Sequence, residues 1–337
     1  MLTNRRAQGE ELSTDGQLVY AVGDIHGRLD LLDRLLGQIA EDVAETKPAE
    51  RPILVFLGDY VDRGPASRGV ISRLLALRDA AALEVRTLKG NHEQALLQFL
   101  EDAAKGPEWV SYGGAATLAS YGVQPPAIDA DEETWADAQM KFASQIPAEH
   151  LAFLRSLELS VTYGDYVFVH AGLRPGVALA DQRETDLLWI RDEFLSAPGP
   201  FEKIVVHGHT PREEPFIGPH RLGLDTGACM TGVLTAARLQ DDDQALLQTK
   251  SAGRPETVED DAPEAGRNLF GLPLDLFGKT PAAQTAPAPP VSTSSDRKPS
   301  PESHIADLLR PEVARSALLV GLLALSFAVL IYSFAVN

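Results

Sequence analysis

The stretch that decides the fold is Ile53-Leu54-Val55-Phe56-Leu57-Gly58-Asp59-Tyr60-Val61-Asp62-Arg63-Gly64. The aliphatic and aromatic run from Ile53 to Leu57 is typical of a strand that is buried on both faces. Polar residues begin where this run ends, with Asp59, Asp62 and Arg63. Because ligands of α/β proteins collect beyond the carboxyl ends of their strands, the sequence predicts part of a functional site here.

Four other strand-like runs precede polar residues in the same way, and all are apolar except for Arg86 and Thr87 in one of them. In order, they are Leu18 to Val22 before Gly23-Asp24-Ile25-His26-Gly27, Val85 to Leu88 before Gly90-Asn91-His92-Glu93, Tyr166 to Val169 before His170, and Ile204 to Val206 before His207-Gly208-His209. Helical patterns such as Leu29 to Ala40 and Ala66 to Ala81 lie between them. The alternation indicates an α/β domain over about residues 17–239.

The residues that follow these runs are metal ligands by type. Asp24, His26 and Asp59 supply oxygen and nitrogen ligands for one divalent ion, and Asp59, Asn91, His170 and His209 could hold a second. A shared carboxylate such as Asp59 holds two cations at the ~3.5 to 4 Å separation of two-metal hydrolases. Such a pair polarises a phosphoryl group and makes hydroxide available near neutral pH, so no protein nucleophile is needed.

The blocks Gly23-Asp-Ile-His-Gly27, Gly58-Asp-Tyr-Val-Asp-Arg-Gly64 and Gly90-Asn-His-Glu93 resemble the signature of the phosphoprotein phosphatases, a family of serine/threonine phosphatases. Trp189-Ile-Arg191, Gly208-His-Thr-Pro211 and Asp225-Thr-Gly227 resemble its compact bacterial and bacteriophage lambda-like members. The resemblance implies a calcineurin-like metallophosphoesterase fold, in which a central β-sandwich is flanked by helices. It also implies six metal ligands: Asp24, His26, Asp59, Asn91, His170 and His209.

By the same resemblance, His92 is the general acid that protonates the departing alkoxide, and Asp62 orients it. Arg63, Arg191 and Asn91 would bind the substrate phosphate, for which a guanidinium fork is well suited. The cofactors implied are two divalent ions. Manganese is expected from the bacterial resemblance, with iron or zinc as alternatives that the ligand types also accept.

Four neighbouring residues are expected to have supporting roles. We expect His207 to pack behind the ligands, Trp189 to pack in the core in preference to lining the cleft, and Asp225 to stabilise the loop under the metals. The lone cysteine, Cys229, reads as a small buried hydrophobe.

A helical insert is predicted at about residues 94–160, with helices at Gln94 to Ala104, Glu132 to Gln145 and Pro147 to Leu157. Within it, Trp109-Val-Ser-Tyr-Gly113-Gly114 predicts a turn, with a close approach of the backbone to a ligand as the alternative.

The two ends of the chain differ from the α/β domain in amino-acid composition. Residues 1–16 form a tail without a signal peptide, and residues 240–315 read as an acidic, proline-rich linker with one apolar island at Asn268 to Gly278. The chain of 337 residues has a net charge of −18, but the segment from Ser316 to Val336 contains no charged residue. Its length and apolar content predict a transmembrane helix over 316–336. Arg310 and Arg315 before this segment predict that the catalytic domain faces the cytoplasm of a single-pass membrane protein, on the inner membrane if bacterial.

The acidic balance argues against a nucleic-acid partner, and the oligomeric state stays open. The function predicted is a metal-dependent serine/threonine protein phosphatase that acts on phosphoprotein substrates and is tethered to the membrane. Symmetrical diadenosine tetraphosphate hydrolysis is the alternative, which Asp62 and Glu93 disfavour. A phospho-binding membrane adaptor without catalysis is the alternative of another class, which the complete set of ligands disfavours.

Overall fold

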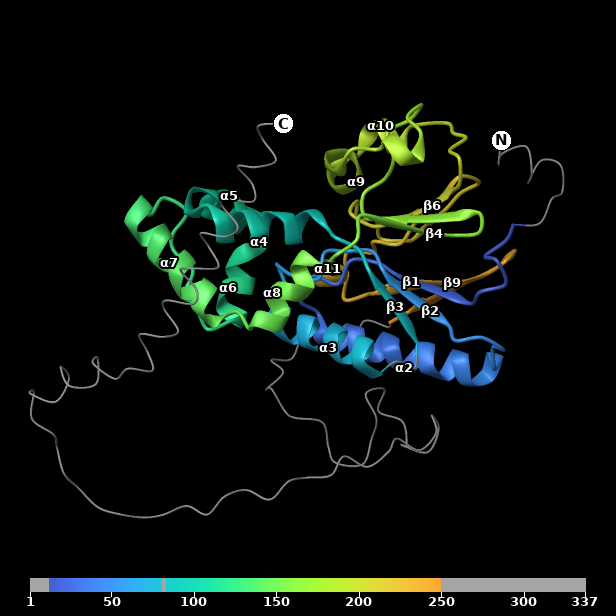
Figure 1. Cartoon of the computed structure of the whole chain (residues 1–337), viewed down its shortest axis with the longest axis horizontal. Helices are drawn as coiled ribbons and strands as arrows, with labels where there is room; N and C mark the ends of the chain where they lie inside the picture. Colours follow the sequence, from blue (N-terminus) through green and yellow to red (C-terminus); the bar gives the residue numbers. More distant parts are fainter. Residues whose placement is uncertain (1–11, 81–82, 250–337) are drawn as a thin grey trace, which may run out of the picture. The chain divides into compact units, whose positions relative to one another are not determined.

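The computed structural model describes residues 12–80 and 83–249, and these form two packed β-sheets with helices outside them (Figure 1). The first sheet has the order β10-β9-β1-β2-β3. Its strands are β1 (Val19–Val22), β2 (Ile53–Phe56), β3 (Glu84–Thr87), β9 (Thr235–Gln240) and β10 (Asp243–Gln248). Strands β1, β2 and β3 are parallel, whereas β9 runs antiparallel to both β1 and β10.

The second sheet has the order β4-β5-β6-β8-β7. Its strands are β4 (Ser160–Tyr163), β5 (Tyr166–Val169), β6 (Ile204–His207), β7 (Phe216–Ile217) and β8 (Arg221–Gly223). Strands β5, β6 and β8 are parallel, and β4 and β7 are antiparallel edges. The prediction of an α/β fold is confirmed, and both sheets are mixed.

The period of two along each strand assigns its side chains to two cores. Val19 and Ala21 of β1 pack between the sheets with Phe168 of β5. Tyr20 and Val22 point the other way, into the core beneath helices α2 (Leu29–Thr46) and α3 (Ser67–Ala80). Because both faces of these strands are covered, apolar residues are required at every position, which is the pattern that the sequence shows.

The outer face of the second sheet is covered by short helices. These are η3 (Leu179–Asp181), α9 (Glu184–Trp189) and α10 (Asp192–Leu195), and a single turn, α11 (Ala228–Thr231), precedes β9. Phe194 of α10 packs with Val167 and Val205 of the sheet.

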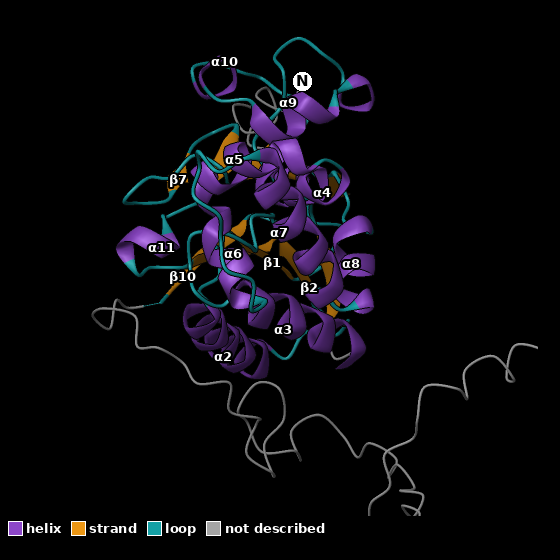
Figure 2. Cartoon of the chain, turned by 90° about the vertical axis from the view of Figure 1, so that its left-hand side faces the viewer, coloured by secondary structure: helices purple, strands orange, loops and turns teal. Residues whose placement is uncertain are grey.

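The insert forms a helical group at one side of the sandwich, seen face-on in Figure 2. It comprises α4 (Asn91–Glu101), η1 (Ala103–Lys105), α5 (Gly106–Trp109), the π-helical turn η2 (Val110–Gly114), α6 (Ala115–Ser120), α7 (Glu132–Gln145) and α8 (Ala148–Arg155). Helix α7 has the bounds that the sequence predicts. An aromatic cluster of Phe99, Trp109, Trp135 and Phe142 fills the interior of the helical insert.

The folded domain extends beyond residues 17–239 at both ends. Asp241 and Asp242, which read as the start of the linker, form the turn between β9 and β10, and Asp241 has the left-handed φ of 51°. At the other end, Leu12 is buried between the sheets, and the Thr14 N–H donates to Asp241 Oδ1 at 2.9 Å. The predicted domain boundary at residue 239 was too early, because a run of aspartates is typical of tight turns as well as of solvated linkers.

Among residues 12–80 and 83–249, no helix has the length and apolar content that crossing a membrane requires. The rest of the predicted linker, its apolar island and the predicted transmembrane segment at 316–336 lie outside the described residues.

Candidate active site

All six predicted ligands are buried in one cluster at the strand ends. Asp24 follows β1, Asp59 follows β2, His170 follows β5, His209 follows β6, and Asn91 begins α4. Asp59 lies 3.6 Å from His26 Nε2 through Oδ2 and 3.5 Å from His170 Nε2 through Oδ1. The Asn91 amide oxygen lies 2.9 Å from His170 Nε2 and 2.8 Å from His209 Nδ1. Residues far apart in sequence therefore converge, as the strand ends predict.

Several ligand residues have an unusual backbone conformation, and two glycines lie very close to ligand side chains. His26, Asp59 and His209 have φ angles of 46°, 52° and 65°, in the left-handed region that non-glycine residues rarely occupy. Two glycines allow the ligands to approach. A Cβ on Gly90 would lie 2.1 Å from Asp59 Oδ1, and one on Gly208 would lie 2.0 Å from Asp24 Oδ1.

Two of the histidines are oriented by backbone carbonyls. The Nδ1 atoms of His26 and His170 lie 2.9 Å from the carbonyl oxygens of Val61 and Leu57. A carbonyl can only accept, so each Nδ1 carries the proton and each Nε2 lone pair faces the cluster. This tautomer is the one that a metal requires.

The donor set fits two divalent ions. Asp59, His170 and His209 form one group with ligand atoms within 4.8 Å of one another, and Asp59 and His26 form another together with His92, which is the predicted acid and not one of the predicted ligands. Asp24 Oδ1 is buried without a hydrogen-bond partner among the described residues. Burial raises the pKa of Asp24 well above its usual range, and the neighbouring Asp225 and Asp59 carboxylates add to the rise. A cation would satisfy such an oxygen, since a buried carboxylate needs a counter-charge or donors.

Asp24, His26, Asp59, Asn91, His170 and His209 would hold the two ions. When bound, ions of this kind supply Lewis acidity toward the phosphoryl group and activate water for attack on phosphorus.

His92 and Asp62 form a hydrogen-bonded dyad beside the cluster. His92 Nδ1 lies 2.7 Å from Asp62 Oδ2, and both side chains are buried. Burial alone would lower the pKa of His92, but the Asp59 and Asp62 carboxylates outweigh it and raise the pKa above its usual value. A raised pKa favours the protonated form of the histidine, which is the form that a general acid requires.

The two predicted phosphate-binding arginines flank the cluster. Arg63 places NH1 3.0 Å from His26 Nε2 and NH2 3.1 Å from His92 Nε2. Arg191 NH1 donates to the carbonyl of His209 at 3.2 Å and to the Thr210 hydroxyl at 3.3 Å. Both guanidinium groups are exposed, so they are accessible to a phosphate in solution.

The turn at Gly113 approaches Arg63. Gly113 has a φ of 114°, and its carbonyl accepts the Arg63 N–H at 3.1 Å. The close backbone approach that paired glycines suggest is therefore made to Arg63.

Glu93 is a supporting residue to which the sequence interpretation gave no role in the site. Its Oε1 accepts the N–H groups of Tyr60 and Val61, and its Oε2 accepts those of Asp59 and Gly90, all at 2.8 to 3.2 Å. Burial and the nearby Asp59 raise its pKa to about 8. A glutamate three residues into a helix that begins after Gly90 is a capping pattern, and that pattern was the available signal.

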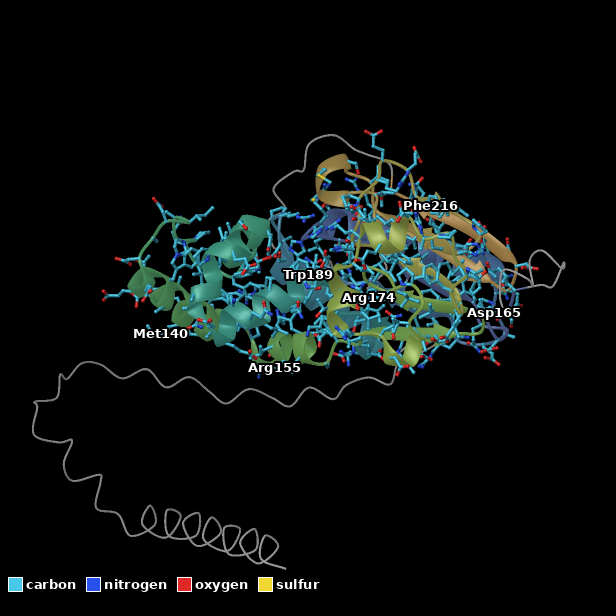
Figure 3. The ribbon with its side chains drawn as sticks, turned by 90° about the horizontal axis from the view of Figure 1, so that it is seen from above. Met140, Arg155, Asp165, Arg174, Trp189 and Phe216 are labelled. Carbon is cyan, nitrogen blue, oxygen red and sulfur yellow. The ribbon has the colours of Figure 1, made fainter. Side chains whose placement is uncertain are left out.

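Trp189 corrects one expectation. Its ring is half-buried beside the cluster, with centroids 6.3 Å from His209 and 6.0 Å from Tyr112, and Nε1 donates to Gln94 at 2.7 Å. In Figure 3 it lies between the insert helices and the second sheet. The packing prediction for Trp189 was wrong because its indole N–H finds a polar partner at the edge of the site.

The other neighbours have supporting positions. His207 packs on Phe194 with ring centroids 5.0 Å apart and lies 3.2 Å from Arg221. Asp225 accepts the Gly227 N–H at 2.9 Å, and burial raises its pKa to about 6. Cys229 is partly buried.

The fold and the buried cluster together place the chain among the metallophosphoesterases. The family model described as calcineurin-like phosphoesterase matches residues 18–229, and the chain belongs to this family. The resemblance to phosphoprotein phosphatases is confirmed at the level of the family.

Three curated relatives show the range of activities among similar proteins. Serine/threonine-protein phosphatase 1 of Salmonella typhimurium is 29% identical over 66% of this chain and 92% of its own length. A symmetrical bis(5'-nucleosyl)-tetraphosphatase of Dechloromonas aromatica is 32% identical over 49% of this chain and 47% of its own. The asymmetrical bis(5'-nucleosyl)-tetraphosphatase PrpE of Bacillus subtilis is 27% identical over 64% and 88%.

Among solved structures, a protein serine/threonine phosphatase from Saccharomyces cerevisiae is 15% identical, with a TM-score of 0.44 over 72% of this chain and 82% of that one.

Proposed function

We propose that the chain is a metal-dependent serine/threonine protein phosphatase. The observation that carries the proposal is the His92–Asp62 dyad, held at 2.7 Å beside a cluster suited to two metal ions. Serine and threonine alkoxides are strongly basic leaving groups, so their phosphate esters gain most from a positioned acid. The Salmonella protein phosphatase, similar along 92% of its length, supports the same substrate class.

Each residue has a stated task in this proposal. Arg63, Arg191 and Asn91 bind and orient the phosphate. His92 Nε2 accepts from Arg63 in this structure, so it can carry a proton once Arg63 turns to the phosphate. His92 then transfers this proton to the departing serine or threonine oxygen, while Asp62 accepts the Nδ1–H and holds the ring in place. Inorganic phosphate leaves without a phosphoenzyme, because attack by water in line with the leaving oxygen needs no protein nucleophile.

The test uses the full-length chain with added manganese. Phosphate release is measured from phosphoserine, phosphothreonine and phosphotyrosine peptides and from diadenosine tetraphosphate. His92→Asn is expected to lower kcat on the phosphoserine peptide by about 10²-fold or more. His220→Asn, a histidine outside the cluster, is the control and should keep wild-type turnover.

Dinucleotide hydrolysis is the second candidate, because relatives with that activity match this chain at similar identity. The ring of Trp189 lies beside His209 and 6.0 Å from the ring of Tyr112, and both rings offer faces on which a base could stack. Preferential cleavage of diadenosine tetraphosphate would move the chain to this class. Metal binding without turnover of any of these substrates would support the remaining alternative, a phospho-binding adaptor without catalysis.

We also propose that the enzyme is tethered to a membrane by residues 316–336, since this uncharged apolar segment has the length of a bilayer span. Such a tether would raise the enzyme's concentration near membrane-associated phosphoproteins. Membrane fractionation of the full chain and of a chain ending at Arg315 tests this. Equal recovery of both in the soluble fraction would refute it.

A further inference from the structure

We propose that Trp109 is a positioning residue that acts on His92 through Asp62, an inference that rests on the proposed role of His92 as general acid. Trp109 Nε1 donates to Asp62 Oδ2 at 2.9 Å. The same oxygen lies 2.7 Å from His92 Nδ1. One carboxylate oxygen therefore joins the interior of the insert to the candidate acid.

The chemistry of the three groups fixes the direction of these hydrogen bonds. An indole N–H can only donate, so Asp62 Oδ2 must accept from Trp109. Asp62 Oδ1 accepts the Thr117 hydroxyl at 2.6 Å. Asp62 is fully buried, so protein donors must satisfy it in place of water. With both oxygens held, the carboxylate presents a lone pair to His92 Nδ1–H, and His92 Nε2 stays directed at the cluster, 3.8 Å from Asp59 Oδ2.

The aromatic cluster of the insert fixes Trp109 itself. Its ring packs on Phe99 and Phe142, with centroids 5.0 and 5.7 Å away. A Cβ on Gly114 would lie 2.5 Å from the indole, so glycine at this position is what allows the turn to close over the ring. Trp109 is 1% exposed and has little freedom to move away from Asp62.

Trp109→Phe keeps an aromatic ring in the cluster and removes the donor to Asp62. We expect kcat on a phosphoserine peptide to fall about tenfold, a part of the contribution of a positioned acid. KM should not change, because Trp109 is buried and reaches the site only through its hydrogen bond to Asp62. Turnover of p-nitrophenyl phosphate should stay within about twofold of wild type, since nitrophenolate leaves without needing a proton.

Trp135→Phe is the matched control. Trp135 is also buried, at 2% exposed, and contacts Phe99 with ring centroids 6.1 Å apart. Its Nε1 has no hydrogen-bond partner among the described residues. This variant should keep wild-type kcat on both substrates, so any loss from merely perturbing the aromatic cluster would show itself here.

A further variant, Thr117→Val, keeps the test decisive if Trp109→Phe folds poorly. Thr117→Val removes the donor to the other Asp62 oxygen and should give the same leaving-group selectivity. In a His92→Asn background, Trp109→Phe and Thr117→Val should have no additional effect, because residues that act through one group are not additive.

A loss in Trp109→Phe that is equal for both substrates, or that adds fully to the loss in His92→Asn, would overturn the positioning role. His92→Asn would still show leaving-group selectivity in that case, and the proposed function would stand. If His92→Asn shows no such selectivity, the acid role and the positioning role both fail.

Discussion

The carboxylate of Glu93 lies against the backbone of Asp59, whose N–H donates to Glu93 Oε2 at 2.9 Å. The two carboxylates are thus neighbours. That of Asp59 is turned toward the cluster of predicted ligands, and that of Glu93 accepts hydrogen bonds from the loop that carries Asp59. That loop has left-handed φ angles at Asp59, Asp62 and Arg63, of 52°, 72° and 68°. The predicted ligand Asp59, the proposed partner of the acid and the proposed phosphate-binding arginine all depend on a conformation that Glu93 stabilises.

Glu93→Gln should therefore lower both stability and metal affinity. Each oxygen of Glu93 accepts backbone N–H groups, so an amide would turn its NH₂ toward other donors. We expect a loss of about 2 kcal/mol in the free energy of unfolding, the usual cost of unsatisfied buried donors, together with weaker manganese binding. Urea unfolding and calorimetric titration measure the two effects. Glu101→Gln on the exposed face of the same helix is the control, and equal behaviour of the two variants would contradict the prediction.

Asp24→Asn should separate stability from metal binding. The variant removes a carboxyl group whose ionised form is disfavoured by burial and by the Asp225 and Asp59 carboxylates, so in EDTA it should be at least as stable as wild type. Added manganese should raise Tm clearly for wild type and little for the variant, because stabilisation by a ligand follows its affinity for the folded state. Thermal melts with and without manganese are the measurement. An unchanged manganese-dependent rise in Tm would show that Asp24 is not a ligand.

Gly113→Ala should impair phosphate binding. Its Cβ would lie 2.6 Å from Arg63 Cγ, at a backbone φ of 114° that alanine rarely adopts. Displacement of Arg63 should raise KM for a phosphopeptide about tenfold, the scale of one lost charge-assisted contact. Gly122→Ala is the matched control, because Gly122 has a φ of 78° with nothing within 4 Å of an added Cβ. A KM that rises equally in both variants would point to general strain instead.

His150 should contribute a measurable acid sensitivity to stability. It is buried between the Tyr121 hydroxyl, 2.8 Å from Nδ1, and the Ser72 hydroxyl, 3.1 Å from Nε2. Burial lowers its pKa below the ordinary value, so the folded state favours neutral imidazole. This contribution is complete above the unfolded pKa of about 6.5 and is lost as the pH falls through the folded pKa.

His150→Gln keeps a donor and an acceptor but cannot be protonated. We expect its unfolding free energy to fall less than that of wild type between about pH 7 and pH 5. Urea denaturation in EDTA at both pH values gives the comparison. Parallel losses in the two proteins would exclude His150 as a source of acid sensitivity.

The hairpin at the end of the domain predicts where the chain can be shortened. Strand β10 pairs with β9 over six residue pairs, and Leu234 and Thr249 exchange two hydrogen bonds. A chain ending at Thr249 should unfold cooperatively. One ending at Gln240 should lose several kcal/mol or aggregate, because it exposes β9 as a sheet edge. Thermal melts followed by circular dichroism compare the stability of the two fragments. Equal stability would refute a structural role for β10.

The sequence was most informative where chemistry and periodicity coincide. Tyr166–Val169 was predicted as a strand with the bounds that it has, because its buried residues occupy both faces of a covered sheet. The convergence of Asp24, Asp59, His170 and His209 could be predicted from their places at strand ends. The strand ends show which residues share an edge of each sheet, whereas the meeting of the two edges depends on how the sheets pack.

The remainder depends on contacts between distant segments. The hydrogen bond from Trp109 to Asp62 spans 47 residues, and no local pattern marks the tryptophan that has a partner in the site. The position of Trp189 beside His209 was missed for the same reason. Asp241 was misread because a turn and a linker use the same residues, and only pairing with Thr14 and β10 tells them apart.

The ligands come from both sheets: Asp24 and Asp59 follow strands of the first, and His170 and His209 follow strands of the second. The first sheet also leads into His26 and Asn91, so it positions four of the six predicted ligands and the second sheet positions two. Partly folded chains that have formed one sheet, or both sheets without packing them together, cannot assemble the full coordination sphere. Manganese affinity should thus report completion of tertiary assembly, and a titration with the metal would count the correctly folded molecules in a preparation.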